Sequence, residues 1–142
     1  MLMPEKIEEI MLAPCGVNCM VCYKHVSVKK HAKSCDGCKK GDDGKPGHCR
    51  KCKIKNCVGE KNLSHCFACQ NFPCTLVKNL ERSYTRRYGV SIINNGRSAK
   101  ASGLSSFMAA ERLKWECLDC GGAFSQHDGI CSECGSSNRR GG

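Results

Sequence analysis

The chain contains fifteen cysteines among 142 residues, and this content constrains its fold more than any other feature. The proportion is far above the ordinary usage of cysteine. Aromatic residues make up only 6% of the chain, so the apolar side chains other than cysteine are too few for a single large core. Chains that are this short and this poor in core residues are normally stabilised by disulfide bonds or by metal ions.

The N-terminal residues and the spacing of the cysteines favour metal ions. Residues 1–10 include acidic side chains and lack the apolar run of a signal peptide. No stretch approaches the roughly 18 apolar residues that span a bilayer. The cysteine count is odd, and most cysteines fall in short paired spacings that are typical of metal ligands in a reducing cytosol. We therefore expect a cytoplasmic metal-binding protein without a membrane segment.

Two paired cysteine motifs near the C-terminus give the strongest signal. A gap of two residues separates Cys117 from Cys120 and Cys131 from Cys134, and a glycine follows each pair. Such a gap lets both thiolates turn toward one ion, and the glycine lets the backbone fold beneath the sulfur atoms. Two such knuckles predict a zinc ribbon, which is a closed and structural site of four thiolates.

Eight further cysteines form a central block, which has enough thiols for two sites of four thiolates. Its first four members repeat the spacing of the C-terminal motif. The sequence does not decide whether the ligands of one ion are consecutive or interleaved along the chain. The predicted ligands of this block are Cys35, Cys38, Cys49, Cys52, Cys57, Cys66, Cys69 and Cys74.

The first three cysteines, Cys15, Cys19 and Cys22, have the spacing with which radical S-adenosylmethionine enzymes hold a four-iron cluster. No βα repeat follows them, so the barrel of that class is not predicted. They are either a [4Fe–4S] site without radical chemistry or a further zinc site. The fourth zinc ligand would then be a cysteine of the central block or one of the histidines His25, His48 and His65. The whole chain would hold three to four zinc ions, or one [4Fe–4S] cluster at these first cysteines.

Apart from the alternative of a fourth zinc ligand, the histidines are expected to have no role in metal binding. His48 and His65 directly precede cysteines and are expected to form hydrogen bonds near a metal site. His127, like His25 and His31, is expected on the solvated surface.

The predicted fold is a small, metal-stabilised α+β or irregular structure. Short helices are expected over 4–13, 73–89 and 103–114, and Asn94-Asn95-Gly96 predicts a turn. Apolar residues between 72 and 115 are expected to form the small core, with Trp115 as a packing residue. The predicted organisation is a cysteine-cluster region at 1–74, a helical segment at 75–114, the ribbon at 115–135 and a flexible tail at 136–142.

The basic residues allow two interpretations. Residues 24–61 contain twelve lysines and arginines against four acids, and Arg82, Arg86 and Arg87 continue this character on the long helix. They can contact nucleic-acid phosphates, or they can balance the charge of the metal sites. Fifteen thiolates with four divalent ions would lower the formal charge from +10 to about +3. Charge balance is therefore the first interpretation and nucleic-acid contact the second.

Several motifs together carry a family resemblance. They are Leu12-Ala13-Pro14-Cys15-Gly16, Cys35-Asp36-Gly37-Cys38, Cys52 with Cys57, the stretch from Cys66 to Phe72-Pro73-Cys74, Arg87-Tyr88-Gly89-Val90 and Trp115-Glu116-Cys117. This pattern resembles the prokaryotic family called domain of unknown function 3795, and the ribbon resembles one that many of its members carry. The resemblance implies a small, cysteine-rich, metal-binding cytoplasmic protein and implies no particular activity.

The sequence shows no phosphate-binding glycine loop, no Ser/His/Asp set and no helical histidine pair. We therefore expect a binding or adaptor module with an unknown protein partner rather than an enzyme. The alternatives are an iron–sulfur redox or enzyme component that uses Cys15, Cys19 and Cys22, and a zinc protein that binds nucleic acid.

Overall fold

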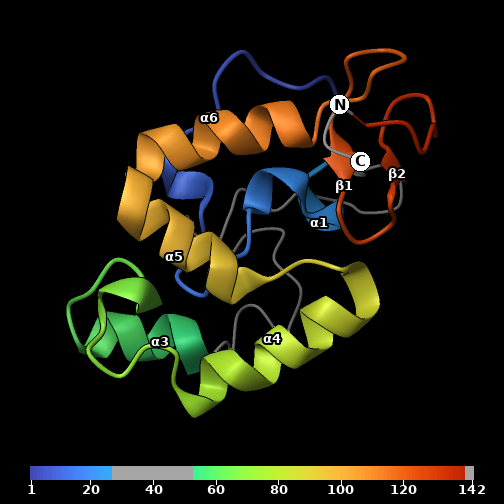
Figure 1. Ribbon diagram of the computed structural model, residues 1–142. Coiled ribbons are helices and arrows are strands. Elements are labelled where there is room, and N and C mark those ends of the chain that lie inside the picture. Colours follow the sequence, from blue (N-terminus) through green and yellow to red (C-terminus); the bar gives the residue numbers. More distant parts are fainter. Residues whose placement is uncertain (27–52, 140–142) are drawn as a thin grey trace.

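A computed structural model describes residues 1–26 and 53–139 of the chain (Figure 1). Short helices dominate, and one two-stranded sheet lies near the C-terminus. The elements in chain order are the 3₁₀ helices η1 (Glu9–Met11) and η2 (Cys19–Val21), α1 (Tyr23–Val26), α3 (Lys53–Glu60), the 3₁₀ helix η4 (Cys66–Ala68), α4 (Thr75–Tyr88), α5 (Ile92–Ser102), α6 (Leu104–Lys114), β1 (Phe124–Ser125) and β2 (Ile130–Cys131).

The N-terminal segment corrects the helix that was expected over 4–13, because only η1 forms there. The backbone of the first residues instead bonds to the C-terminal ribbon, where the Met3 N–H donates to the Gly121 carbonyl over 3.1 Å. The side chains of Ile7 and Leu12 are buried in the core. Tertiary hydrogen bonds thus replace the helical hydrogen bonds that the apolar spacing suggested.

Helix α4 confirms the helix predicted over 73–89. Its C-terminus is capped by Gly89, which adopts the left-handed conformation with φ of 66°, as glycine does at many helix ends. Val77 is fully buried, whereas Leu80, Tyr84 and Tyr88 are half-buried against the core. The apolar side of the helix therefore points toward the core, except for Leu76, which is 37% exposed.

Helix α5 corrects the turn that was predicted at 94–96, because the helix passes through these residues. Its first turn is stabilised by side chains, since the Ser91 hydroxyl accepts from the Asn94 N–H over 3.1 Å and the Glu81 carboxylate accepts from the Ile93 N–H over 2.9 Å. Asn95 is buried and donates to the Gly16 carbonyl over 2.9 Å. Capping and a tertiary contact thus override the local turn signal.

Helix α6 confirms the prediction over 103–114, and its residues Phe107 and Met108 are buried. Trp115 follows the helix directly and is only 4% exposed, which confirms its packing role. Two cations lie over its ring, with Arg139 at 4.3 Å and Lys114 at 5.4 Å from the ring centroid.

The core is wider than the predicted stretch of 72–115. The largest fully buried side chains include Leu12 and Val21 from the N-terminal segment and Phe124 from the ribbon, together with Ile92 and Met108. The N-terminal segment lies against α6, and α1 contacts β1. The apolar residues beside the first cysteines therefore supply much of the core.

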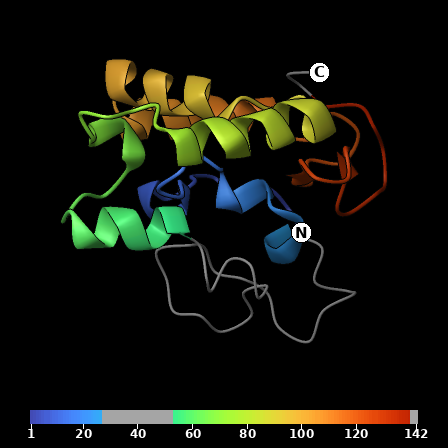
Figure 2. The ribbon, with the colours of Figure 1, turned by 90° about the horizontal axis from the view of Figure 1, so that it is seen from below.

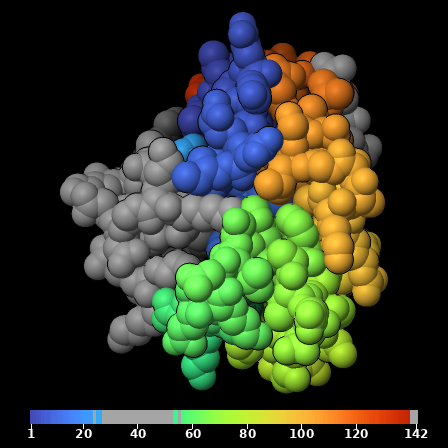
Figure 3. Space-filling model, turned by 90° about the vertical axis from the view of Figure 1, so that its left-hand side faces the viewer, coloured from blue at the N-terminus to red at the C-terminus, as the bar shows by residue number. Residues whose placement is uncertain are grey.

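The helices pack around the N-terminal segment. Helix α5 packs on both α6 and α4, and Figure 2 shows these helices on one side, with α1 and α3 on the other. The space-filling view shows the N-terminal residues beside the segment that contains α5 and α6 (Figure 3). The β1–β2 hairpin and α3 lie at opposite ends (Figure 1). No helix in the described parts of the chain has the length and apolar character needed to cross a bilayer.

Candidate metal centre

Four cysteine sulfur atoms come together in the C-terminal ribbon. The Sγ atoms of Cys117 and Cys134 are 3.7 Å apart, and those of Cys120 and Cys131 are 3.6 Å apart. All four sulfur atoms lie within 4.8 Å of one another. Within 1–26 and 53–139, no other group of three or more histidine, cysteine or acidic ligands is gathered so closely. The structure therefore brings together the four residues that the C-terminal motif predicted.

The backbone of the two knuckles positions these thiols. Strands β1 and β2 pair in antiparallel register, with Phe124 opposite Cys131, and they join the knuckles. Gly121 and Gly135 have φ of 76° and 73°. Their N–H groups donate to the carbonyls of Cys117 and Cys131. The left-handed glycines close each knuckle, as the motif predicted.

The electrostatics of the cluster favour a bound cation. The Glu133 N–H donates to the Sγ of Cys131 over 3.4 Å. Burial alone would raise the pKa of Cys117, but the N–H groups of Cys120 and Asp119 bring that pKa below its ordinary value. At Cys120 the Gly122 N–H acts to lower the pKa, yet burial and the neighbouring sulfur atoms raise it to about 12. Four thiolates at this spacing need a positive ion between them.

The donor set fits a tetrahedral metal ion. A zinc ion with Zn–S bonds of about 2.3 Å would place its four sulfur ligands about 3.8 Å apart. The observed sulfur separations of 3.6 and 3.7 Å are close to this value. Cys117 and Cys131 are buried, while Cys120 and Cys134 are exposed. The cluster can therefore hold one metal ion near the surface.

Gly122 is a functional residue that the motif did not identify. A β-carbon at this position would lie 2.6 Å from the Sγ of Cys131 and 3.0 Å from the Cγ of Glu133. Only glycine leaves enough room for the thiol of Cys131 to face the other three. The second glycine of the Gly121-Gly122 pair was the available sequence signal.

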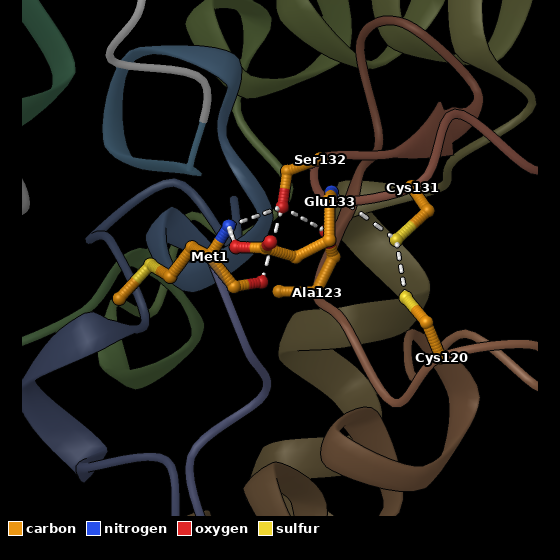
Figure 4. A network of polar contacts seen from close by, with 6 residues as sticks. All are labelled: Met1, Cys120, Ala123, Cys131, Ser132 and Glu133. Carbon is orange, nitrogen blue, oxygen red and sulfur yellow. Dashed lines mark hydrogen bonds and ion pairs between the residues drawn. The ribbon is translucent and has the colours of Figure 1, made fainter.

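The N-terminus is attached to this ribbon. The Met1 ammonium donates to the Ser132 hydroxyl over 3.0 Å and pairs with the Glu133 carboxylate (Figure 4). The Met1 carbonyl accepts from the Ala123 N–H over 2.8 Å. Ser132 and Glu133 directly follow Cys131, so the first residue of the chain contacts the second knuckle.

The hairpin loop contacts the segment of the first cysteines. The Gln126 N–H donates to the Val21 carbonyl over 2.8 Å, and the Tyr23 N–H donates to Nδ1 of His127 over 3.4 Å. Because Nδ1 accepts, the other ring nitrogen, Nε2, donates to the Tyr84 hydroxyl over 3.1 Å. The rings of Tyr23, Tyr84 and Tyr88 surround the imidazole at 4.7–5.6 Å between centroids.

His127 is therefore half-buried, which corrects the expectation of a solvated surface residue. Its neighbours are distant in sequence, so neither the periodicity nor the motifs could indicate this environment. The imidazole connects the loop of the ribbon to α1 and α4.

The first three cysteines lie near η2 and α1. Cys15 and Cys19 are buried, and Cys22 is half-buried. Cys66 approaches this segment through its backbone, because its N–H donates to the Pro14 carbonyl over 2.8 Å. Within the described part of the chain, the sulfur atoms of Cys15, Cys19 and Cys22 do not form a ligand group of the kind found in the ribbon. Their role as ligands stays a prediction.

His65 lies beside the same segment and is only 2% exposed. Its Nε2 donates to the Leu12 carbonyl over 3.1 Å, since a carbonyl oxygen can only accept. The ring stacks on Phe67 with 4.8 Å between centroids. Nε2 thus forms a hydrogen bond to the backbone, and the expected metal site beside His65 stays a prediction. His25 is half-buried in α1, which corrects the expectation of a solvated surface residue there.

Lys61 lies near three half-buried cysteines, which are Cys57, Cys69 and Cys74. Its ammonium donates to the Sγ of Cys69 over 3.5 Å. This bond, followed by the negative charge of the nearby thiolates, raises the pKa of Lys61. The Asn71 N–H, 3.5 Å from the same sulfur, is the main cause of the lowered pKa of Cys69. This contact agrees with the interpretation that basic residues balance thiolate charge, which stays a prediction, and the sequence did not single out Lys61.

The remaining predicted ligands lie outside the described residues. These are Cys35, Cys38, Cys49 and Cys52, and the histidines His31 and His48 lie there too. No disulfide bond joins any two of the eleven cysteines that the structure describes.

The fold and the cluster define a small, cysteine-rich helical protein with a candidate four-thiolate metal centre at its C-terminal end. The model of a family described as "Protein of unknown function (DUF3795)" matches residues 11–79, which is just under half of the chain. This match confirms the family resemblance drawn from the motifs of that region. The C-terminal cluster lies beyond the matched residues. Comparison with curated proteins and with solved structures gave no match.

Proposed function

We propose that this protein is a cytoplasmic zinc-binding protein that acts as a binding module. One zinc ion would be held by Cys117, Cys120, Cys131 and Cys134. The observation that carries the proposal is the convergence of four sulfur atoms within 4.8 Å of one another. Thiolate ligands in tetrahedral arrangement are typical of zinc and of iron–sulfur centres.

A structural role for this ion follows from its ligands. Four protein ligands would complete a tetrahedral zinc shell and leave no position for water or substrate. The same knuckles contact Met1, and the loop between them contacts Val21 and Tyr23. Zinc at this position would therefore stabilise both the ribbon and the N-terminal segment.

Further zinc ions are proposed at the other cysteines, for a total of three to four. The contact of Asn71 with Cys69 supports this, because it repeats the bond from the N–H two residues after Cys131 to its sulfur. The ammonium of Lys61 beside Cys69 supplies the counter-charge that a thiolate site needs. A [4Fe–4S] cluster at Cys15, Cys19 and Cys22 is the competing assignment for the first cysteines.

The cytoplasmic location is supported by the eleven described cysteines, which form no disulfide bond with one another, since cysteines of this number without disulfides suit a reducing compartment. The role as a binding module is supported by the exposed polar face of α4, where arginine and lysine side chains are not engaged by the core.

The experiment is a metal analysis of the full chain, purified without oxygen, together with its absorption spectrum. The proposal expects a colourless protein with about three to four zinc ions per chain. A brown protein that contains iron would instead support the competing assignment, an iron–sulfur cluster at the first cysteines. Fewer than about two zinc ions in a folded, colourless protein would contradict the multi-zinc proposal.

A further inference from the structure

We propose that the exposed face of α4 binds the phosphate backbone of nucleic acid. The inference rests on the proposed role as a binding module and names its partner class. The inference is independent of which metal the ribbon binds. This surface, here called the α4 groove, consists of a row of basic side chains and the hollows beside them. Its residues are Thr75, Lys78, Asn79, Glu81, Arg82, Ser83, Thr85, Arg86 and Ile93.

The cations of the α4 groove lie along one side of the helix. Lys78, Arg82 and Arg86 recur every fourth residue, and all three are exposed. Four helical residues correspond to about 6 Å along the axis, so the row extends for about 12 Å. Arg87, beside the last of them, is also exposed. Such a row presents several positive charges to one extended, negatively charged ligand.

The acid of the helix is engaged elsewhere. One carboxylate oxygen of Glu81 accepts from the Thr85 hydroxyl over 2.9 Å. The other accepts from the Ser91 hydroxyl over 3.1 Å and from the Ile93 N–H over 2.9 Å. Glu81 therefore stabilises the first turn of α5 rather than the cations of α4.

The cations themselves lack acidic partners within the described residues. Arg82 donates to the neutral amide of Asn79. None of the ion pairs found among 1–26 and 53–139 includes a cation of the row. As far as residues 1–26 and 53–139 are concerned, their charge is therefore available to a ligand without the breaking of an ion pair.

The groove provides polar contacts as well as charge. Two adjoining hollows of about 430 and 680 Å³ share Asn79, Glu81 and Arg82. Hydroxyl and amide side chains such as Thr75, Ser83 and Asn79 line them together with the cations. Arg, Lys, Ser, Thr and Asn side chains are those that commonly contact phosphate and sugar.

The same lining argues against an acidic protein as the partner. The core of a protein interface is enriched in aromatic side chains, methionine and arginine, and it is depleted in lysine, glutamate and serine. In the α4 groove, Ile93 is the single apolar residue and is half-buried. No aromatic side chain lines the hollows, so stacking on bases is not expected there. The expected binding is therefore to the backbone and independent of base sequence.

The test measures fluorescence anisotropy of a labelled DNA duplex of mixed sequence titrated with the full, metal-loaded chain at several salt concentrations. We expect a Kd of about 1–100 μM that rises steeply with salt. The double variant Arg82→Gln/Arg86→Gln should weaken binding about 10-fold or more. It should also reduce the slope of log K against log salt by about two. A second duplex of different sequence should bind equally well.

The matched control is Lys6→Gln/Lys100→Gln, which removes the same charge at two exposed lysines outside the α4 groove. It should change the Kd less than about 2-fold. Equal losses in both variants, or no duplex binding at low salt by folded protein, would overturn the proposal. Binding of polyglutamate but not DNA would overturn it in favour of an acidic protein. Metal content is measured on the same samples, so a failure of the zinc proposal appears separately.

Discussion

The side-chain amide of Asn18 donates to the Oε1 atom of Glu111 over 3.3 Å, and this buried bond joins the segment of the first cysteines to α6. The same oxygen accepts from the indole N–H of Trp115, also over 3.3 Å. Asn18 is fully buried and Glu111 is 5% exposed. The carboxylate therefore links the N-terminal segment to the C-terminal end of α6 and to Trp115, which directly follows that helix.

Removal of this acceptor should destabilise the fold. In Glu111→Ala, the amide of Asn18 and the indole of Trp115 both lose their acceptor inside the protein. We expect a loss of about 2–4 kcal/mol in the free energy of unfolding. Glu111→Gln retains an Oε1 acceptor and should lose less than about 1 kcal/mol. Urea unfolding of the metal-loaded variants measures both, and equal losses would contradict the role of the acceptor.

Glu111 also predicts a pH dependence. Burial raises its pKa above the ordinary value of 4.5, even though Lys114 and its hydrogen-bond donors act in the opposite direction. The folded state then binds the proton more tightly than the unfolded state. Stability from this group is therefore complete below pH 4.5 and declines as the pH rises toward the folded-state pKa.

The measurement compares the native protein with Glu111→Gln, which does not titrate at this position. As the pH rises from 4.5 through the folded-state pKa, the variant should become more stable relative to the native protein. Parallel stability curves over this range would show that the carboxyl group does not titrate with a raised pKa.

Local patterns predicted some of the fold because the interactions that decide those parts are local. Helix α4 ends at Gly89, and the ribbon cysteines are close in sequence, so spacing alone identified them. The expected helix at 4–13 and the turn at 94–96 failed for the opposite reason. Met3 bonds to Gly121 and Asn95 bonds to Gly16, and no local pattern reveals such partners.

Substitution of Gly122 should weaken metal binding in the ribbon. A β-carbon in Gly122→Ala would lie 2.6 Å from the Sγ of Cys131 and would displace that ligand. We expect the affinity for zinc to fall about 10- to 100-fold, as measured by competition with a chelator. Gly59→Ala in α3 is the control, because nothing lies within 4 Å of its β-carbon. Similar affinities for both variants would exclude this steric role.

The imidazole of His127 should stabilise the contact between the ribbon loop and α4. His127→Ala removes the hydrogen bond to Tyr84 and the ring contacts with three tyrosines. Its thermal and urea unfolding should show a loss of about 2–3 kcal/mol, while His127→Phe, which keeps the ring contacts, should lose about 1 kcal/mol. Asp128→Ala at the exposed neighbouring position should be close to neutral. Equal effects at 127 and 128 would contradict the account.

The candidate site was predicted from sequence to different extents in its different parts. The clustering of the four ribbon cysteines follows from their spacing, whereas the roles of Gly122, Lys61 and His127 depend on tertiary contacts. Lys61 precedes Cys69 by eight residues, yet the two side chains meet because the chain turns between α3 and η4. Nothing in the periodicity of the chain indicates that turn.

The most direct test of the central claim is the zinc content of a ribbon variant, Cys117→Ser/Cys134→Ser, measured beside the native chain. The control is Leu118→Ala, an exposed residue between two ligands of the same knuckle. The four-thiolate site predicts about one zinc ion fewer per chain in the double variant and no loss in the control. Unchanged zinc content in Cys117→Ser/Cys134→Ser would contradict a zinc ion at these four cysteines.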